Sequence, residues 1–164
     1  MIDNQKELFI VVDKDDNVIE YRTRYDCHHD KSLFHRAIGV IIYNDENKII
    51  LQKRSMLKDL NPGKYTLSVS GHVTKGESYK EAAIREMQEE IGIQTSIKYV
   101  TKFLCKMPEE TEMEMVFTAR HNGPFTIAED EVEKAEFFKK EEIIKIQEKL
   151  TPFAKMSLQN IGIL

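Results

Sequence analysis

The segment from Glu77 to Ile91 constrains the fold of this chain more than any other stretch. It contains neither proline nor glycine, and it is rich in the helix-favouring residues Ala, Glu, Met, Gln and Arg. Gly92 follows directly, and a glycine at this place predicts the C-terminal end of a helix because it adopts a left-handed conformation without strain. The sequence therefore predicts a helix over residues 77–91.

One arc of this predicted helix is apolar. When the residues are wound at about 100° each, four apolar side chains fall together, namely Ala83, Ile84, Met87 and Ile91. A stripe of this kind predicts the face that packs on a core.

A different arc carries the carboxylates of Glu86, Glu89 and Glu90, at i, i+3 and i+4 spacing. One interpretation is a solvated, charge-laced helix. Against it, three carboxylates on one patch repel each other unless protons or cations relieve them. Carboxylate oxygens suit Mg²⁺ or Mn²⁺, which commonly bridge to substrate phosphates. Arg85 lies one turn before Glu89 and can brace it.

Strand-like patterns surround the predicted helix. They cover residues 8–12, 18–21, 36–43, 49–51, 65–70, 97–105, 112–119 and 135–138. Turn-forming residues join the first two runs and the next two, so each pair predicts a hairpin. Residues 141–150 have helical spacing, and Thr151-Pro152 predicts the start of a last helix. Strands mixed with a few helices indicate a mixed sheet with helices packed on its faces.

The bulk properties exclude several classes of protein. The 164 residues predict a single domain over residues 1–164. A net charge of −4 disfavours nucleic-acid polymers and anionic membranes as partners, and the chain has no apolar run of membrane-spanning length. Cys27 and Cys105 lack metal-site or redox spacing and are expected to be free thiols. We therefore expect a cytoplasmic protein.

The stretch GHVTKGESYKEAAIREMQEEIGI, residues 71–93, resembles the signature of the Nudix hydrolases at every defining position. The fixed residues of that signature stand here as Gly71, Glu77, Arg85, Glu86, Met87, Glu89, Glu90, Gly92 and Ile93. So many matches at fixed spacing make this a strong signal. The resemblance implies an α/β (α+β) fold of the Nudix type, an α/β/α sandwich with a mixed β-sheet.

The resemblance also implies an activity. Nudix hydrolases cleave a diphosphate linkage in a small molecule with the help of Mg²⁺ or Mn²⁺, which polarises phosphoryl oxygens and activates water. By resemblance, Glu86, Glu89 and Glu90 are metal ligands and part of the catalytic group, and the Gly71 carbonyl adds a ligand. Arg85 and Glu77 orient the carboxylates. Many relatives pair, so a homodimer is one assembly that the resemblance allows.

The flanking run from His28 to His72 is similar to a narrower group, the isopentenyl-diphosphate delta-isomerases. These share the Nudix fold but move a double bond, and they use histidines and glutamates to hold a metal. The matching positions here are His28, His35, His72, Glu110 and Glu112. This set predicts either a second metal or phosphate pocket or a group of structural histidines.

Two features disfavour isomerase activity. The isomerase has a cysteine just before its Gly-His pair, whereas this chain has Ser70, and a hydroxyl is a far weaker acid than a thiol. Isomerase sites also contain tryptophan, which this chain lacks. We therefore expect a Mg²⁺-dependent hydrolase acting on a nucleoside diphosphate derivative or related organic diphosphate. The alternatives are an isomerase and a non-catalytic ligand sensor.

Outside the helix, two further groups have candidate roles. Glu110, Glu112 and Glu114 alternate and would face the same way on a strand, which predicts either a solvent-facing acidic edge or a contribution of Glu112 to the metal site as ligand or base. Arg54 and Lys58 precede a Pro-Gly turn, and by resemblance they face the substrate phosphates, with ordinary surface charge as the alternative for Lys58.

Overall fold

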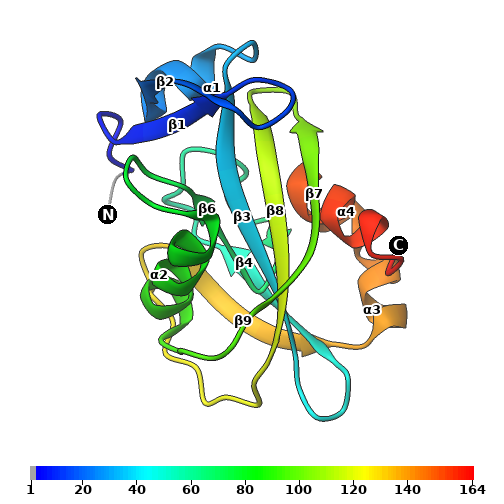
Figure 1. Cartoon of the computed structure of the whole chain (residues 1–164). Helices are drawn as coiled ribbons and strands as arrows, with labels where there is room; N and C mark the ends of the chain where they lie inside the picture. The colour runs from blue at the N-terminus through cyan, green and yellow to red at the C-terminus, as the bar shows by residue number, and fades with distance from the viewer. Residues whose placement is uncertain (1–2) are drawn as a thin grey trace.

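Strand β3 (Phe34–Tyr43) is the axis of the fold in the computed structural model, which describes residues 3–164. Along one edge, β3 runs parallel to β8 (Thr111–Arg120) over its whole length. Along the other edge, it pairs antiparallel with β1 (Leu8–Val12) and then with β6 (Val69–His72). The residues of β3 therefore fix the positions of three other strands, as Figure 1 shows.

The remaining strands extend this arrangement into one mixed sheet. β2 (Val18–Thr23) pairs with β1, and β7 (Lys98–Lys106) pairs with β8. β4 (Ile49–Arg54) pairs with β5 (Tyr65–Thr66) and with β9 (Val132–Phe138). The hairpin predicted from residues 8–12 and 18–21 is present as β1 and β2.

The sheet opens between β3 and β4. These strands follow each other in the chain, but they pair only at Tyr43 and Ile49, so the predicted hairpin is confined to its turn. The Ser68 hydroxyl bridges the opening by accepting from the Ile42 N–H at 2.8 Å and donating to the Ile50 carbonyl at 2.6 Å. The single strand predicted over residues 65–70 is therefore wrong: β5 joins β4, and β6 crosses to β3.

Helix α2 (Tyr79–Ile91) is the predicted carboxylate helix, and it begins two residues later than expected. Ser78 caps it: its hydroxyl accepts from the Glu81 N–H, and the Glu81 carboxylate accepts from the Ser78 N–H. Such a cap stabilises a helix by about 1 kcal/mol. Gly92 ends the helix with a φ of 67°, in the left-handed conformation that the sequence predicted.

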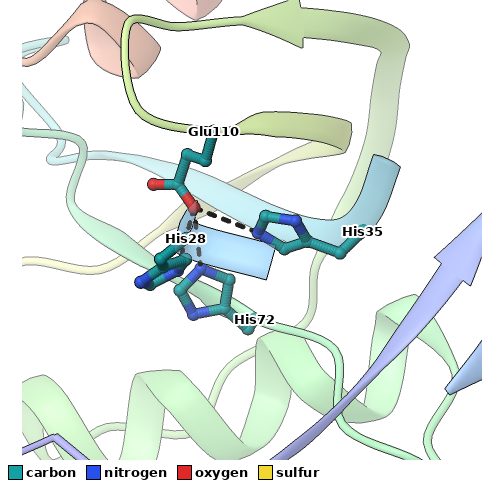
Figure 2. Close-up of side chains that lie close together, drawn as sticks. All are labelled: His28, His35, His72 and Glu110. Carbon is teal, nitrogen blue, oxygen red and sulfur yellow. Dashed lines mark ion pairs between the residues drawn. The ribbon is translucent and has the colours of Figure 1, made fainter. Parts of the chain in front are cut away.

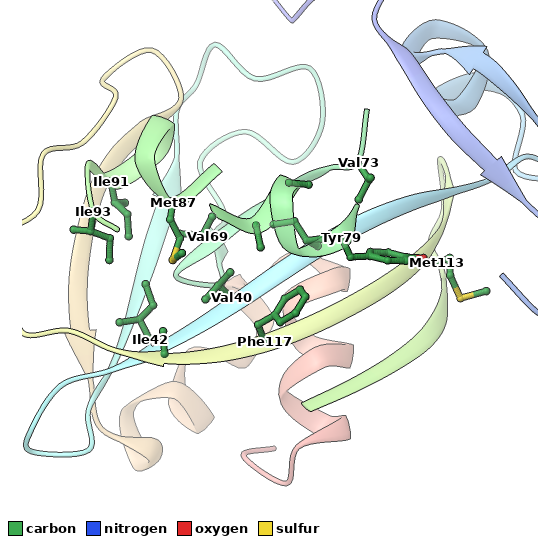
Figure 3. Packing of buried hydrophobic residues seen from close by; sticks show 14 of the residues in the cluster. Val40, Ile42, Val69, Val73, Tyr79, Met87, Ile91, Ile93, Met113 and Phe117 are labelled. Carbon is green, nitrogen blue, oxygen red and sulfur yellow. The ribbon is translucent and has the colours of Figure 1, made fainter. Parts of the chain in front are cut away.

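The apolar face of α2 packs on the sheet. Met87 and Ile91 lie against Val40, Ile42 and Val69, and all five are buried (Figure 3). Burying a side chain of this kind contributes roughly 1.5–3 kcal/mol. Ile84, which the helical pattern placed on this face, is only partly buried.

The opposite face of the sheet is covered by the C-terminal helices. α3 (Lys140–Lys145) contributes Ile143, and α4 (Pro152–Asn160) contributes Phe153 and Leu158 to a second core. α2 thus lies on one side of the sheet and the C-terminal helices on the other (Figure 1), which confirms the α/β/α sandwich.

The helix predicted over residues 141–150 is wrong in one respect. α3 ends at Lys145, and a separate 3-10 turn, Gln147–Lys149, follows. This break brings Leu150 into the core and lets the Thr151 N–H bond the Tyr65 carbonyl at 2.8 Å. Thr151 then caps α4, with Pro152 at its first position, as the sequence predicted.

The sequence did not predict helix α1 (Arg24–His29). Its six residues are too few for a helical period, but Thr23 caps it and the buried Cys27 anchors it beside Phe9 and Val11. Both cysteines are free and buried. Among residues 3–164, no helix is long and apolar enough to cross a membrane.

Candidate functional site

A cavity of about 270 Å³ opens where β6 turns away from β4. Its lining comes from many parts of the chain: the N-terminal segment with α1, β4 with the loop after it, β5, β6, helix α2, β8 with the turn before it, the segment before β9 and the start of the last helix. The predicted Nudix carboxylates and most of the His/Glu set line this one cavity. The two candidate sites are therefore parts of a single chamber.

The α2 side of the chamber carries three carboxylates in different surroundings. Glu86 and Glu90 are buried, whereas Glu89 has half of its side chain exposed. Burial raises the pKa of Glu86 to about 7, and the charges of Glu89 and Glu131 add to this effect against the opposing pull of Arg85. Burial, followed by the charges of Glu86 and Glu131, also raises the pKa of Glu90. The carboxylates of α2 therefore lack enough positive charge around them, and a bound cation would supply it.

Arg85 holds three of the neighbouring carboxylates in place. Its guanidinium pairs with both oxygens of Glu77, at 2.5 and 3.0 Å, and reaches Glu86 at 2.7 Å and Glu89 at 3.2 Å. A fifth bond, of 3.1 Å, goes to the His72 carbonyl in β6. This fork ties the helix to the strand, a geometry that lysine cannot reproduce.

Gly71 lets β6 approach the helix closely. A Cβ at this position would overlap the Glu86 carboxyl group, so only glycine fits between the strand and that side chain. On the next turn of the helix, Glu90 accepts hydrogen bonds from the Gln52 amide and from the Ser70 N–H. β4 and β6 together therefore aim the carboxylates at the chamber.

The opposite side of the chamber gathers His28 from α1, His35 from β3, His72 from β6 and Glu110 from the turn before β8 (Figure 2). One potential ligand atom from each lies within 4.8 Å of the others. The Nε2 atoms of the three histidines lie 2.9, 3.1 and 3.9 Å from the same Glu110 oxygen. We call these four residues the His/Glu centre.

The His/Glu centre has the features of an ion-binding site. The ring nitrogens of His28 and His35 and the Glu110 oxygen are buried and make no well-aligned hydrogen bond, even though they lie close together. Ring nitrogens and a carboxylate oxygen that point toward one position are better placed to coordinate a cation than to hydrogen-bond one another. Three imidazoles and one carboxylate suit Zn²⁺, Mn²⁺ or Fe²⁺.

Glu112 borders the His/Glu centre. Its carboxylate lies 3.1 Å from the His72 Nε2 atom and 3.5 Å from that of His35. Burial alone would lower the pKa of His35, but the carboxylates of Glu110 and Glu112 outweigh it and raise that pKa to about 9. Burial and Glu110 act to raise the pKa of Glu112, but the histidines lower it to about 2.

The expectation of a solvent-facing acidic edge is wrong. Glu110, Glu112 and Glu114 are all buried, with exposed fractions of 6%, 5% and 1%. Glu112 and Glu114 project from the same face of β8 as Val116, the face that α4 covers with Phe153, and they line the chamber. A single strand could not reveal this, because burial depends on its neighbours.

The predicted phosphate-binding residues line the mouth of the chamber. Arg54 donates to the Leu60 carbonyl at 3.1 Å, which fixes the loop, and the Lys58 ammonium pairs with Asp3 at 2.6 Å. Arg24 and Asp59, which the sequence did not predict as site residues, form a two-bond ion pair at 3.1 and 3.3 Å beside His28. No spacing signal links them, since 35 residues separate them.

Comparisons with known proteins agree with this geometry. Residues 33–160 match the family model described as NUDIX domain. The chain is 40% identical over 109 residues to a prenyl-diphosphate phosphatase from Methanosarcina mazei, an alignment that covers 66% of this chain and 63% of that relative. It is also 34% identical over 131 residues to isopentenyl-diphosphate delta-isomerase 2 from Photorhabdus laumondii, covering 77% of this chain and 73% of that enzyme.

A solved structure is similar over nearly the whole chain. The crystal structure of DR0079 from Deinococcus radiodurans superposes with a TM-score of 0.81 at 21% identity, and it covers 93% of this chain and 98% of that one. At this level of identity, the likeness concerns the fold alone.

Proposed function

This chain belongs to the NUDIX domain family, and from that premise we propose that it is a hydrolase that uses a divalent cation to cleave a diphosphate linkage in a small organic molecule. The observation that carries the proposal is the placement of Glu86, Glu89 and Glu90 on one wall of a chamber whose mouth carries Arg54 and Lys58. Negative groups for cations thus face positive groups for phosphates. The naming of a curated relative as a phosphatase supports a pyrophosphohydrolase.

The α2 residues fit a hard cation. Glu86, Glu89 and Glu90 offer carboxylate oxygens, and Gly71 offers a backbone carbonyl beside Glu86. Burial and mutual repulsion raise the pKa values of Glu86 and Glu90, so a cation would relieve a strain that already exists. Mg²⁺ or Mn²⁺ held there would polarise phosphoryl oxygens and lower the pKa of water.

The remaining residues prepare the chamber for a diphosphate. Arg85 fixes the direction of Glu86 and Glu89, and the loop residues Arg54 and Lys58 supply positive charge at the mouth. Lys58 already holds the carboxylate of Asp3, a contact that a phosphate oxygen can replace. Glu112 is ionised at neutral pH, because the histidines hold its pKa low, so its carboxylate is available as a ligand.

The names of two relatives support a class of substrate. One is named for the removal of phosphate from prenyl diphosphates and another for the isomerisation of isopentenyl diphosphate. Both names specify an organic diphosphate. We therefore propose that organic diphosphates, prenyl diphosphates included, are substrates beside nucleoside diphosphate derivatives.

Isomerase activity is the second candidate, and the His/Glu centre favours it. The geometry brings together His28, His35, His72 and Glu110, with Glu112 beside them, which is the set that resembles the isomerase's metal site. Ser70 remains the obstacle. It lines the chamber where the isomerase has its cysteine, and its hydroxyl is a weak proton donor.

The test is a phosphate-release assay with the full chain and Mg²⁺. We expect turnover to disappear on chelation, to return with added Mg²⁺, and to fall sharply in Glu89→Gln. Glu148→Gln is the matched control, because it removes the same charge from an exposed site. Turnover that survives chelation, or that is unchanged in Glu89→Gln, would overturn the cation assignment.

A further inference from the structure

The N-terminal strap, which we define as residues 3–7, lies at the mouth of the chamber, and three of its residues line the cavity. Two backbone hydrogen bonds hold the strap to the start of α1. The Arg24 N–H donates to the Glu7 carbonyl at 2.8 Å, and the Tyr25 N–H donates to the Gln5 carbonyl at 3.1 Å. The strap is therefore anchored beside α1 and reaches from there to the loop after β4.

The Asp3 carboxylate is the contact between the strap and that loop. One of its oxygens lies 2.6 Å from the Lys58 ammonium. The other lies 3.4 Å from the Arg24 guanidinium and 3.4 Å from the Asp59 backbone nitrogen. The side chains of Asp3, Lys58 and Arg24 are only 12%, 11% and 8% exposed. Two cationic side chains and one backbone N–H therefore converge on a single carboxylate that is largely shielded from water.

The same donors suit a phosphate group. Phosphate and carboxylate oxygens accept the same charge-assisted hydrogen bonds. Lys58 is the residue proposed above to supply positive charge for the phosphates of the substrate, and it lines the chamber. Its ammonium already has Asp3 at 2.6 Å and the Glu131 carboxylate at 3.8 Å. A phosphate oxygen that approaches Lys58 therefore competes with the Asp3 carboxylate for the same donors.

The strap is held loosely enough to be displaced. Apart from the contacts of Asp3, residues 3–164 have one hydrogen bond between the strap and the loop after β4. It runs from the Gln5 side-chain amide to the Asp59 carboxylate and is long, at 3.4 Å. A carboxylate on a short tether competes at an effective concentration on the order of millimolar. A diphosphate carries more charge than one carboxylate, and cations on the α2 wall would hold its other oxygens. A diphosphate is therefore able to replace Asp3.

We propose that Asp3 is an internal competitor for the substrate: the N-terminal strap occupies the phosphate position at Lys58 in the free protein and leaves it when a diphosphate binds. The fraction of molecules in which the strap is closed then weakens the apparent affinity for the diphosphate. This inference rests on the proposed role of Lys58 in holding a phosphate, but it does not depend on whether the bound diphosphate is hydrolysed.

Asp3→Asn tests the competition, because it keeps the shape of the side chain and removes its charge. The probe is methylenediphosphonate with Mg²⁺, a diphosphate analogue in which carbon replaces the bridging oxygen, so that it binds without being cleaved. We expect its dissociation constant to fall about fivefold, the upper range for an exposed ion pair that no longer has to be broken. Asp15→Asn is the matched control, because it removes the same charge from an exposed turn outside the chamber lining.

A second variant shows whether the effect passes through Lys58. Lys58→Gln should weaken the binding of methylenediphosphonate, because it removes a cation from the phosphate position. When Asp3→Asn is added to Lys58→Gln, we expect little further tightening, since the closest contact of the strap is already gone. Calorimetric titration of the wild type, the two single variants and the double variant gives the coupling. Melting temperatures establish that each variant folds.

Hydrogen exchange follows the strap itself. The Tyr25 N–H is bonded to the Gln5 carbonyl, which belongs to the strap. Because the strap leaves the mouth when the ligand binds, exchange of this amide in the wild type should become faster when methylenediphosphonate is added. Slower exchange would mean that the strap closes over the ligand, and it would overturn the proposal.

Three affinity results would also overturn it. The first is a dissociation constant that is the same in the wild type and Asp3→Asn, and the second is binding of the probe by neither. The third is equal tightening in Asp3→Asn and Asp15→Asn, which would indicate an effect of net charge alone. Failure of the proposed function looks different. Tighter binding by Asp3→Asn without turnover of any diphosphate would contradict the hydrolase alone, and Mg²⁺-dependent turnover with unchanged affinity would contradict the internal competitor alone.

Discussion

The two walls of the chamber bring their charged and metal-binding side chains together in opposite ways. On α2, residues 86, 89 and 90 come from one turn of one helix, and an arginine from the same helix holds them. On the other wall, the three histidines and Glu110 come from four separate parts of the chain, and no arginine or lysine among residues 3–164 pairs with Glu110. The residues of the α2 site are close in sequence and are held by the guanidinium of an arginine. The residues of the His/Glu centre are far apart in sequence and are brought together by the fold.

This difference has a chemical consequence. The α2 wall offers oxygen atoms alone, which suit Mg²⁺, whereas the His/Glu centre offers imidazole nitrogens, which suit Zn²⁺, Mn²⁺ or Fe²⁺. The two walls are therefore expected to bind different cations with different affinities. The following predictions test that contrast, starting with the largest effect.

The largest effect is expected from Glu90→Gln. Removing a buried carboxylate from the α2 wall should lower turnover at least about a hundredfold, which is the lower range for loss of a positioned catalytic group. Without cations the same variant should be more stable than the wild type at pH 8, because burial and Glu86 raise the pKa of Glu90 and so make its ionised form costly.

The sign of this stability difference is testable. A raised carboxyl pKa means that the folded state retains a proton that the unfolded state has lost, so the penalty appears only above the ordinary pKa of 4.5. Melting temperatures of the two proteins should therefore differ at pH 8 and converge near pH 4. A variant that is active, or less stable at pH 8, would contradict this account of the α2 wall.

The His/Glu centre should respond to His72→Gln. His72 is the most accessible of the three histidines, so this change removes a ligand with little loss of packing. We expect the affinity for Zn²⁺ to fall about a hundredfold, the upper end for a disturbed metal site, while the Mg²⁺ concentration for half-maximal turnover remains unchanged. Calorimetric Zn²⁺ titration of both proteins measures the first quantity. Equal Zn²⁺ affinities would contradict a metal site on this wall.

A smaller effect is expected from Arg85→Lys. Lysine keeps the charge but cannot bond Glu77, Glu86 and the His72 carbonyl at once. Turnover should fall about tenfold, within the range for a supporting partner, and more Mg²⁺ should be needed for half-maximal rate. Lys80→Arg, an exposed change on the same helix, is the control. Kinetics identical to those of the wild type would show that turnover does not depend on the hydrogen bonds of the Arg85 guanidinium.

The smallest effect is expected at Asp16, which connects helix α2 to strands of the sheet. Asp16 in the β1–β2 turn bonds Arg36 of β3, Tyr79 of α2 and Lys102 of β7 at 2.8–2.9 Å. Burial opposes ionisation of Asp16, but these bonds outweigh it and lower its pKa. Asp16→Asn should therefore cost about 1–3 kcal/mol of unfolding free energy at neutral pH, and the difference from the wild type should vanish as the pH falls below 3.8. A difference that is independent of pH would contradict the ionised bridge.

The contrast between the walls also explains what the sequence predicted. α2 was predictable because its periodicity, its Gly92 end and its carboxylate spacing are all properties of consecutive residues. The grouping of His28, His35 and His72 depended on a family resemblance, because their distance in space is set by α1, β3 and β6 together. The spacing of these histidines along the sequence would not have predicted that they lie together.

Some features had no signal in the sequence. The burial of Glu114 depends on α4 covering the face of β8 from which Glu114 projects, and the pairing of Arg24 with Asp59 depends on a loop folding back over α1. The split of residues 65–70 into two strands depends on Ser68 filling the opening beside β3. Each is a consequence of tertiary contacts that override local propensity.

The most direct test of the central claim is to follow the products by phosphorus and proton NMR. The full chain would be incubated with Mg²⁺ and a panel of nucleoside diphosphates, nucleoside triphosphates, nucleotide sugars and isopentenyl diphosphate. The account predicts release of phosphate or a monophosphate ester from at least one of them. Conversion of isopentenyl diphosphate to its allylic isomer with no phosphate released from any compound would contradict it and would make the His/Glu wall the site of the chemistry.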